Sequence, residues 1–112
     1  MVDILPSTPY RAPTFSARTT DVFDAWFAGR QDPVAKRRIQ ARIDRLSMGN
    51  PGDRKSAGSP VVEIRIDHGP GYRVYSVRRG PIRVILRCGG DQSTQQADIR
   101  AAHAMLARLD ME

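Results

Sequence analysis

Cysteine and lysine are scarce in this sequence of 112 residues, and long apolar runs are missing. Cys88 is the one cysteine, so the chain can form no internal disulfide and offers no thiolate cluster for zinc. A lone thiol fits a reducing compartment, and we expect a cytoplasmic protein. No apolar run approaches membrane-spanning length, and the start MVDILPSTPYRAP lacks the basic and apolar parts of a signal peptide. We therefore expect no membrane partner.

The charge is strongly positive and is carried by arginine. The chain has 18 Lys and Arg residues against 12 Asp and Glu, and only Lys36 and Lys55 are lysines. Arginine is the side chain that makes forked contacts with phosphate and carboxylate groups. A polyanion or an acidic protein is therefore a plausible partner, although a solvated basic surface would have the same composition.

Length and proline content indicate a single domain that follows a tail. Residues 1–13 contain three prolines and no periodicity, which predicts a flexible N-terminal extension. Residues 14–112 are long enough for one domain with a core of its own. The 40% apolar fraction is typical of a globular protein of this size.

Two helices are expected in the first half of the domain. After a short strand at residues 14–18, Thr20 or Asp21 caps a helix that ends near Gly29. Asp32, followed by proline, starts a second helix that ends near Gly49. The apolar positions of the second helix repeat at helical spacing and form its buried stripe. They are Ala35, Ile39, Ile43 and Leu46.

Three strands follow a polar loop at residues 50–60. Residues 61–67, 72–78 and 82–88 have strand patterns and are separated by two short glycine turns. Such short connections predict an antiparallel meander. A short amphipathic helix closes the chain, marked by Ile99, Ala102, Leu106 and Leu109. The predicted fold class is α+β, with the helices packed on one face of an antiparallel sheet.

The alternation within the strands predicts a row of arginines. A first hairpin centred on Gly69 places Arg65 opposite Arg73 and Glu63 opposite Tyr75. Arginines placed directly opposite each other repel, which is unusual in a purely structural sheet. A second hairpin centred on Gly80 would add Arg87 to the row. We expect this face to bind an anion, although three solvated arginines on an open sheet remain the alternative.

The segment CGGDQSTQ places a polar hook directly after the third strand. Gly89 and Gly90 would permit a sharp turn, and Asp91 and Gln92 would emerge at the end of the sheet. Capping of the last helix by Asp91, Ser93 or Thr94 is the simpler explanation of the hook. It would still lie at the edge of the arginine face.

Four strings make the chain resemble a known family. RTTDVFDAWF, RIQARIDRLSMGNPGD, VEIRIDHGPGYRVYSVRRG and CGGDQSTQQADI are similar to the HigB-like addiction module killer proteins of the RelE/ParE toxin superfamily. The resemblance covers about residues 15–107. It implies a RelE/ParE-like fold and a toxin of a type II toxin–antitoxin module. Its partner would be a small helix-turn-helix antitoxin, and it would reach DNA only through the antitoxin complex.

The resemblance also implies an activity. Many superfamily members cleave mRNA on the ribosome, whereas the ParE branch inhibits DNA gyrase without being enzymatic. A third possibility is an inactive basic module that only binds its antitoxin. The family's lysine in the hook, GGDKSTQ, is replaced here by Gln92, and Arg87 stands where the family usually has an apolar residue.

Together with the arginine face, the resemblance implies a metal-independent endoribonuclease without a cofactor, in which Lys55 matches the family's lysine after GD. In that chemistry the 2′-hydroxyl attacks the adjacent phosphorus while preorganised cations stabilise the charge. The general base stays open, with Glu63, His68 and His103 as candidates. The expected catalytic residues are Arg65, Arg73, Lys55 and Gln92. The expected RNA-binding residues are Tyr72 and Tyr75 as stacking platforms, with Arg87 and Asp91.

Overall fold

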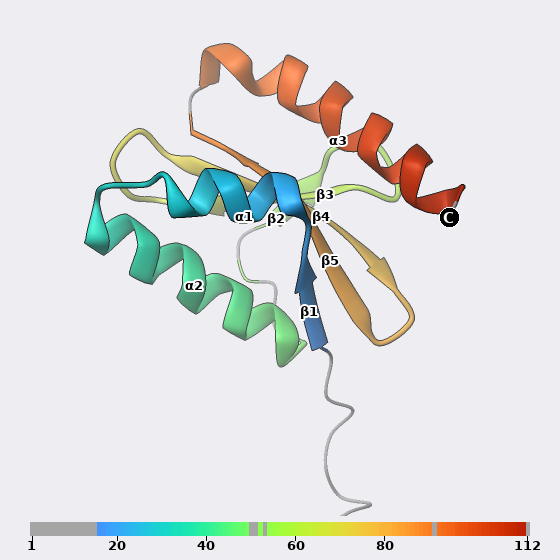
Figure 1. Ribbon diagram of the computed structural model, residues 1–112, viewed down its shortest axis with the longest axis horizontal. Coiled ribbons are helices and arrows are strands. Elements are labelled where there is room, and N and C mark those ends of the chain that lie inside the picture. Colours follow the sequence, from blue (N-terminus) through green and yellow to red (C-terminus); the bar gives the residue numbers. More distant parts are fainter. Residues whose placement is uncertain (1–15, 50–51, 53, 91, 112) are drawn as a thin grey trace, which may run out of the picture.

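The computed structural model describes residues 16–49, 52, 54–90 and 92–111. The expectations for residues 1–13 and for Asp91 lie outside this part of the chain. Within the described residues, three helices and a five-stranded sheet make an α+β fold (Figure 1). The strands are β1 Ser16–Thr19, β2 Arg54–Ser56, β3 Val62–Ile66, β4 Tyr72–Arg79 and β5 Ile82–Gly89. The helices are α1 Asp21–Ala28, α2 Pro33–Ser47 and α3 Gln95–Asp110, the last preceded by a 3-10 turn, η1 Gln92–Thr94.

The predicted starts of the first two helices are confirmed. The Thr20 hydroxyl accepts a hydrogen bond from Phe23 N at 3.1 Å and caps α1. The Asp32 carboxylate accepts from the backbone N–H groups of Val34 and Ala35 and caps α2. Each cap satisfies donors that have no partner inside the helix. The predicted stripe of α2 is buried, with Ala35, Ile39, Ile43 and Leu46 all in the core.

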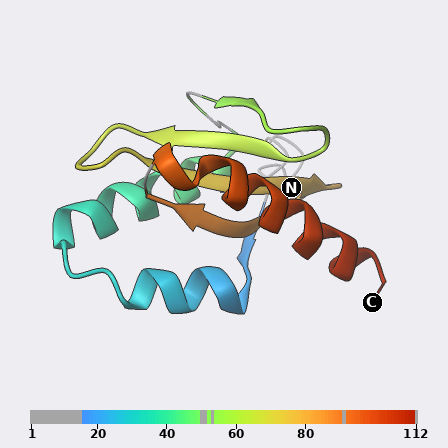
Figure 2. The ribbon, with the colours of Figure 1, turned by 90° about the horizontal axis from the view of Figure 1, so that it is seen from above.

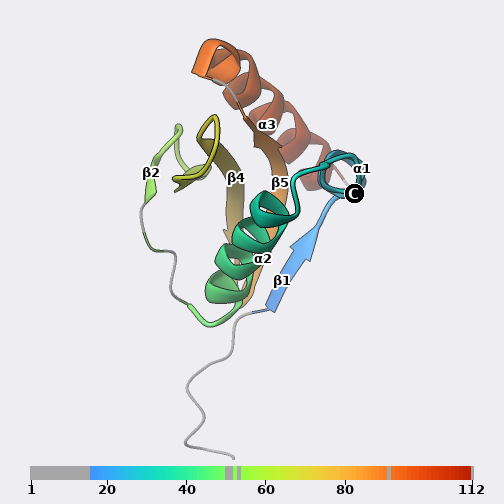
Figure 3. The same cartoon turned by 90° about the vertical axis from the view of Figure 1, so that its left-hand side faces the viewer.

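The sheet is mixed, which corrects the expected antiparallel sheet. Its strand order is β1-β5-β4-β3-β2. β1 runs parallel to β5 at one edge, and the other pairs are antiparallel (Figure 3). After β1 the chain passes through α1 and α2 to β2 at the opposite edge, and the strands that follow return until β5 lies beside β1. Such a parallel pairing needs a long connection and leaves little trace in local patterns.

The register of the first hairpin is confirmed and that of the second is wrong. In β3 and β4, Arg65 pairs with Arg73 and Glu63 pairs with Tyr75, as expected. Between β4 and β5, however, Arg73 pairs with Gly89, and the register shifts between Tyr75 and Ser76. The predicted row of Arg65, Arg73 and Arg87 therefore does not form.

A β-bulge in β5 causes the shift. Tyr75 pairs with Arg87 while the next residue, Ser76, pairs with Ile85, so Leu86 is the extra residue of the bulge. Leu86 packs in the cluster beneath α3, and Arg87 binds Asp98 of α3. Leu86 and Arg87, although successive in β5, therefore both point to the face of the sheet that α3 covers.

Helices cover both faces of the sheet, which corrects the expectation of a single covered face (Figures 1 and 2). α1 and α2 pack on one face, against residues such as Ile64, Val74 and Ile85. α3 packs on the other, against Tyr75, Val77 and Leu86. With 16 residues it is the longest helix rather than a short closing one. None of the helices within the described residues is long and apolar enough to cross a membrane.

Thr20 connects the cap of α1 to the bulge of β5. Its hydroxyl donates to the Leu86 carbonyl at 2.7 Å while it accepts from Phe23 N. We expect Thr20→Val to lower the free energy of unfolding by about 2 kcal/mol, because the variant loses the cap and leaves a carbonyl without its donor. Urea unfolding measures this change. Thr19→Val, at an exposed neighbouring position, is the control. Equal stability of the two variants would contradict the bridging role.

Candidate functional site

Charged residues from four strands gather on the face of the sheet that carries α3. Lys55 pairs with Glu63, Glu63 with Tyr75, and Tyr75 with Arg87. In the next row, Arg65 pairs with Arg73. Residues directly opposite each other share a face, so the first row continues from β2 to β5. The structure thus brings most of the expected site residues to one face of the sheet, but not as the expected row of three arginines. They are Lys55, Arg65, Arg73, Tyr75 and Arg87.

A buried carboxylate, Glu63, lies at the centre of this group. Its side chain is 1% exposed. Its Oε2 is 3.3 Å from Arg65 Nε, and its Oε1 accepts from the Tyr75 hydroxyl at 3.3 Å and from Gln95 Nε2 at 2.8 Å. Arg73 Nε lies 3.9 Å from Oε1. Both oxygens are therefore engaged, and Glu63 serves as a counter-ion rather than as an accessible base.

The Glu63 carboxylate reduces the repulsion expected between the two opposed arginines. The repulsion between Arg65 and Arg73 is offset because Glu63 lies within 4 Å of both. A buried charge is costly unless it is paired and hydrogen-bonded, and Glu63 meets both conditions. Burial, followed by the negative charge of Glu63, raises the pKa of the Tyr75 hydroxyl. Tyr75 therefore stays protonated and keeps donating to Glu63.

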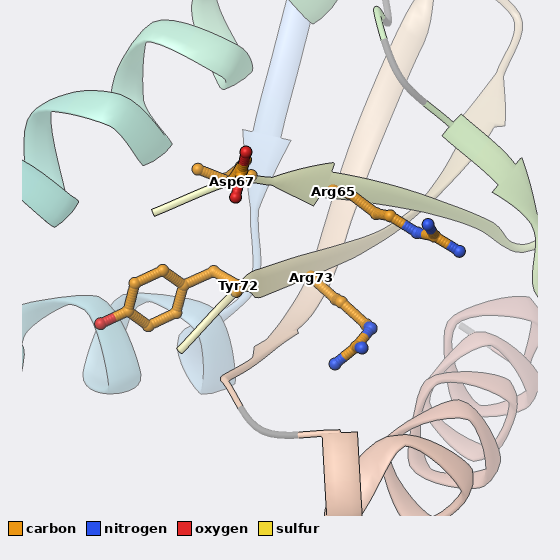
Figure 4. A pocket seen from close by; sticks show the side chains of 6 residues that line it. Arg65, Asp67, Tyr72 and Arg73 are labelled. Carbon is orange, nitrogen blue, oxygen red and sulfur yellow. The ribbon is translucent and has the colours of Figure 1, made fainter. Parts of the chain in front are cut away.

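The two arginines differ in their access to solvent. The Arg65 side chain is 47% exposed and the Arg73 side chain 15%. They extend from neighbouring strands to the same side, and with Tyr72 and Asp67 they line a pocket of about 260 Å³ (Figure 4). Within the described residues, the buried Arg73 Nε has no hydrogen-bond partner. This buried atom faces Glu63, so the half-exposed guanidinium of Arg65 is the one that an incoming anion can reach.

Arg87 belongs to a second, partly buried ion pair. Its guanidinium lies 3.0 Å from Asp98 of α3, whose side chain is 9% exposed. The Thr94 hydroxyl donates to the other oxygen of Asp98 at 2.9 Å. Arg87 therefore fixes α3 to the sheet, next to the Glu63 group and not in a row with Arg73.

The two tyrosines do not offer the stacking platforms expected of them. Tyr75 is fully buried under α3, and Tyr72 is 7% exposed. Tyr72 points to the opposite face, where its ring meets the Trp26 ring edge-on at 5.7 Å (Figure 4). Only part of Tyr72 reaches the pocket. A ring without a free face cannot stack a base in this conformation.

The two glycines of the hook are needed because neighbouring side chains leave little room for a Cβ, and not because the backbone adopts a left-handed conformation. Neither Gly89 nor Gly90 has a positive φ. A Cβ on Gly89 would lie 2.3 Å from the Asp98 carboxylate, and one on Gly90 would lie 3.2 Å from the Tyr72 ring. Of Gln92, the structure describes the backbone at the start of η1. The Thr94 side chain makes no capping hydrogen bond and instead donates its hydroxyl to Asp98, while the expected cap by Asp91 lies outside the described residues.

The other residues considered for a role in catalysis, two histidines and the cysteine, are hydrogen-bonded to neighbouring groups or buried. His68 pairs with Asp32 at 3.0 Å, which lowers the pKa of that carboxyl, and His103 contacts the Ala57 carbonyl at 2.9 Å. Burial raises the pKa of the Cys88 thiol. Within the part of the chain that the structure describes, no group of three His, Cys, Asp or Glu side chains could hold a metal ion.

Two important partners escaped the sequence reasoning. Gln95 gives no signal, because a glutamine in the first turn of a helix is ordinary. Asp98 does give one, since it lies four residues before Ala102 on the buried stripe of α3. An acid at such a position needs a cation across the interface.

The fold and the site define an α+β protein with a basic cluster built over a buried carboxylate. No family model matches the chain, and no solved structure matches it. An uncharacterized protein of Haemophilus influenzae is 45% identical to it over 98 residues, which are 88% of this chain and 99% of that protein. The chain belongs to the same family as that protein.

The central role of Glu63 can be tested by removing its charge. We expect Glu63→Gln to lower the free energy of unfolding by about 3 kcal/mol, because Arg73 would lose its buried counter-ion. Asp44→Asn, on the exposed side of α2, is the matched control and should change stability little. Urea unfolding compares the two. A loss for Glu63→Gln no larger than that of the control would contradict this role.

Cys88 should behave as a core residue. It is 3% exposed, and burial raises its pKa, so little thiolate is available to react. We expect iodoacetamide at pH 8 to leave the folded protein unmodified and to alkylate it fully in urea. Intact-mass measurement reads out both states. Rapid labelling of the folded protein would show that the thiol is accessible.

Proposed function

We propose that this protein is the toxin of a type II toxin–antitoxin module and cleaves mRNA on the ribosome. The observation that carries the proposal is the pair Arg65 and Arg73, held over buried Glu63 at the wall of a pocket. The sequence resemblance to HigB-like killer proteins supplies the substrate class. The RelE/ParE-like fold is part of the same proposal, supported by two helices followed by a meander.

The charge of the cluster suits phosphoryl chemistry. Arg65 and Arg73 lie within 4 Å of the Glu63 carboxylate, and Lys55 pairs with Glu63 across the strands, so positive charge remains in excess. The transition state of RNA cleavage places extra negative charge on the phosphorane oxygens. Cations held before the substrate arrives stabilise that charge without reorganising.

The side chains divide this task. Arg65, half exposed, contacts a non-bridging oxygen of the scissile phosphate. Arg73, which is more buried, orients that phosphate from the sheet side of the pocket. Glu63 positions both guanidinium groups and does not touch the RNA. Lys55, exposed on the edge strand β2, adds charge beside them. The 2′-hydroxyl of the RNA loses its proton to water and forms the new O–P bond as the bond from phosphorus to the 5′-oxygen breaks. The products are a 2′,3′-cyclic phosphate and a 5′-hydroxyl that takes its proton from water.

The proposed partners follow from the same assignment. A helix-turn-helix antitoxin neutralises the toxin in the cytoplasm, and the complex rather than the toxin binds DNA. Acidic antitoxin residues complement the surplus of arginine, which sets specificity and association rate.

Removing the exposed arginine should abolish activity while the fold survives. We expect Arg65→Ala to slow cleavage of ribosome-bound mRNA by about 100- to 1000-fold, as when one preorganised donor is lost. Because Arg65 is about half exposed, stability should change by less than about 1 kcal/mol. Mapping RNA ends after induction, with translation on and off, measures the activity.

Arg78→Ala, at the far end of β4, is the control for this experiment and should cleave normally. Full activity of Arg65→Ala would remove the proposed site. Growth arrest with intact mRNA and inhibited DNA supercoiling would replace the nuclease with a gyrase inhibitor.

A further inference from the structure

A second basic surface lies on α2. Arg38, Arg42 and Arg45 are spaced by four and three residues, so they share one face of the helix. Together with Ile66 and Asp67 they line a pocket of about 210 Å³. Arg38 and Arg45 are exposed, and Arg42 is partly buried.

This surface is continuous with the candidate site. Ile66 and Asp67 line both the pocket of Arg65 and Arg73 and the pocket of the α2 arginines. The Arg42 guanidinium donates to the Arg65 backbone carbonyl, which joins helix and strand at this point. β2 pairs with β3 only at Val62, Glu63 and Ile64, so beyond Ile64 no described strand covers the edge of β3. The path from one pocket to the other therefore runs past Asp67, around the end of β3 with which β2 does not pair.

The charges along the path fit one class of ligand. Arginines at both ends match the evenly spaced phosphates of an extended nucleic-acid strand. Asp67, which is exposed and lines both pockets, would repel phosphate but can accept a hydrogen bond. A ribose 2′-hydroxyl is such a donor, and a deoxyribose has none. The order of charged groups along the path, with a hydrogen-bond acceptor between two groups of arginines, thus favours single-stranded RNA over DNA.

We propose that the α2 arginines and Asp67 form a track for the RNA strand that leaves the cleavage site. Arg38 and Arg45 bind phosphates, and Asp67 accepts from a 2′-hydroxyl. This inference rests on the proposed function, because the pocket of Arg65 and Arg73 is taken as the point where the strand begins.

The test separates the pocket from the track by RNA length. Fluorescence anisotropy measures the binding of labelled oligouridine RNA, with a gel to verify that it stays intact. A trinucleotide reports on the pocket, and the additional affinity of an octanucleotide reports on the track. The test variant is Arg38→Gln/Arg45→Gln, which spares Arg42 and its contact with β3. The control is Arg37→Gln/Arg78→Gln, which removes the same charge elsewhere.

We expect the test variant to bind the octanucleotide roughly 10-fold more weakly at low salt and the trinucleotide normally. Its plot of log K against log salt should lose a slope of about 1.4, or about 0.7 for each phosphate contact. Asp67→Ala should reduce the preference for RNA over the matching DNA. The control variant should keep the native values, and thermal unfolding verifies that all variants are folded.

Several results would overturn the track. They are an octanucleotide that binds native protein no more tightly than the trinucleotide, equal slopes for test and control variants, and an RNA preference that survives Asp67→Ala. Loss of binding to duplex RNA alone would assign these arginines to structured RNA instead. Failure of the proposed function gives a different result, because Arg65→Ala would then leave trinucleotide binding unchanged.

Discussion

The burial of one carboxylate, that of Glu63, constrains the part of the molecule that carries the site. An ionised group with 1% exposure is tolerated only where cations and hydrogen-bond donors surround it. These come from three elements: Arg65 from β3, Arg73 and Tyr75 from β4, and Gln95 from α3. The first turn of α3 must therefore lie over the β3–β4 hairpin. The same contacts hold two guanidinium groups in place before any ligand arrives.

The bulge at Leu86 makes this arrangement possible. It turns Arg87 toward α3, where Arg87 meets Asp98, and Gly89 leaves room for that carboxylate. α3 is therefore held by two buried carboxylates, one on the sheet and one on the helix. Thr20 ties the bulge to α1 on the other side of the sheet. A local irregularity in one strand thus couples the two helical layers.

The local features of the fold could be predicted from the sequence, and the non-local ones could not. Helix starts at Thr20 and Asp32 depend on neighbouring residues, and the first hairpin depends on a turn centred on Gly69. The bulge depends on α3 and Thr20, which are distant in sequence. A regular second hairpin, without the bulge, would place Arg87 opposite Arg73, as the sequence pattern predicts. The parallel pairing of β1 with β5 was missed for the same reason.

The candidate site shows the same division. Arg65 and Arg73 were expected, because alternation along a strand assigns side chains to a face. Lys55 was expected from the family resemblance alone, in a segment that the sequence pattern predicts as a loop and that forms strand β2. The burial of Tyr72 and Tyr75 was not, because a strand face reads as exposed until the element that covers it is known. Trp26 covers one ring and α3 the other. Covering Tyr75 also changes its chemistry, since a tyrosine expected to meet RNA instead donates to Glu63. The surface left for a ligand therefore consists of guanidinium groups, whose positions depend on a carboxylate that the ligand never touches.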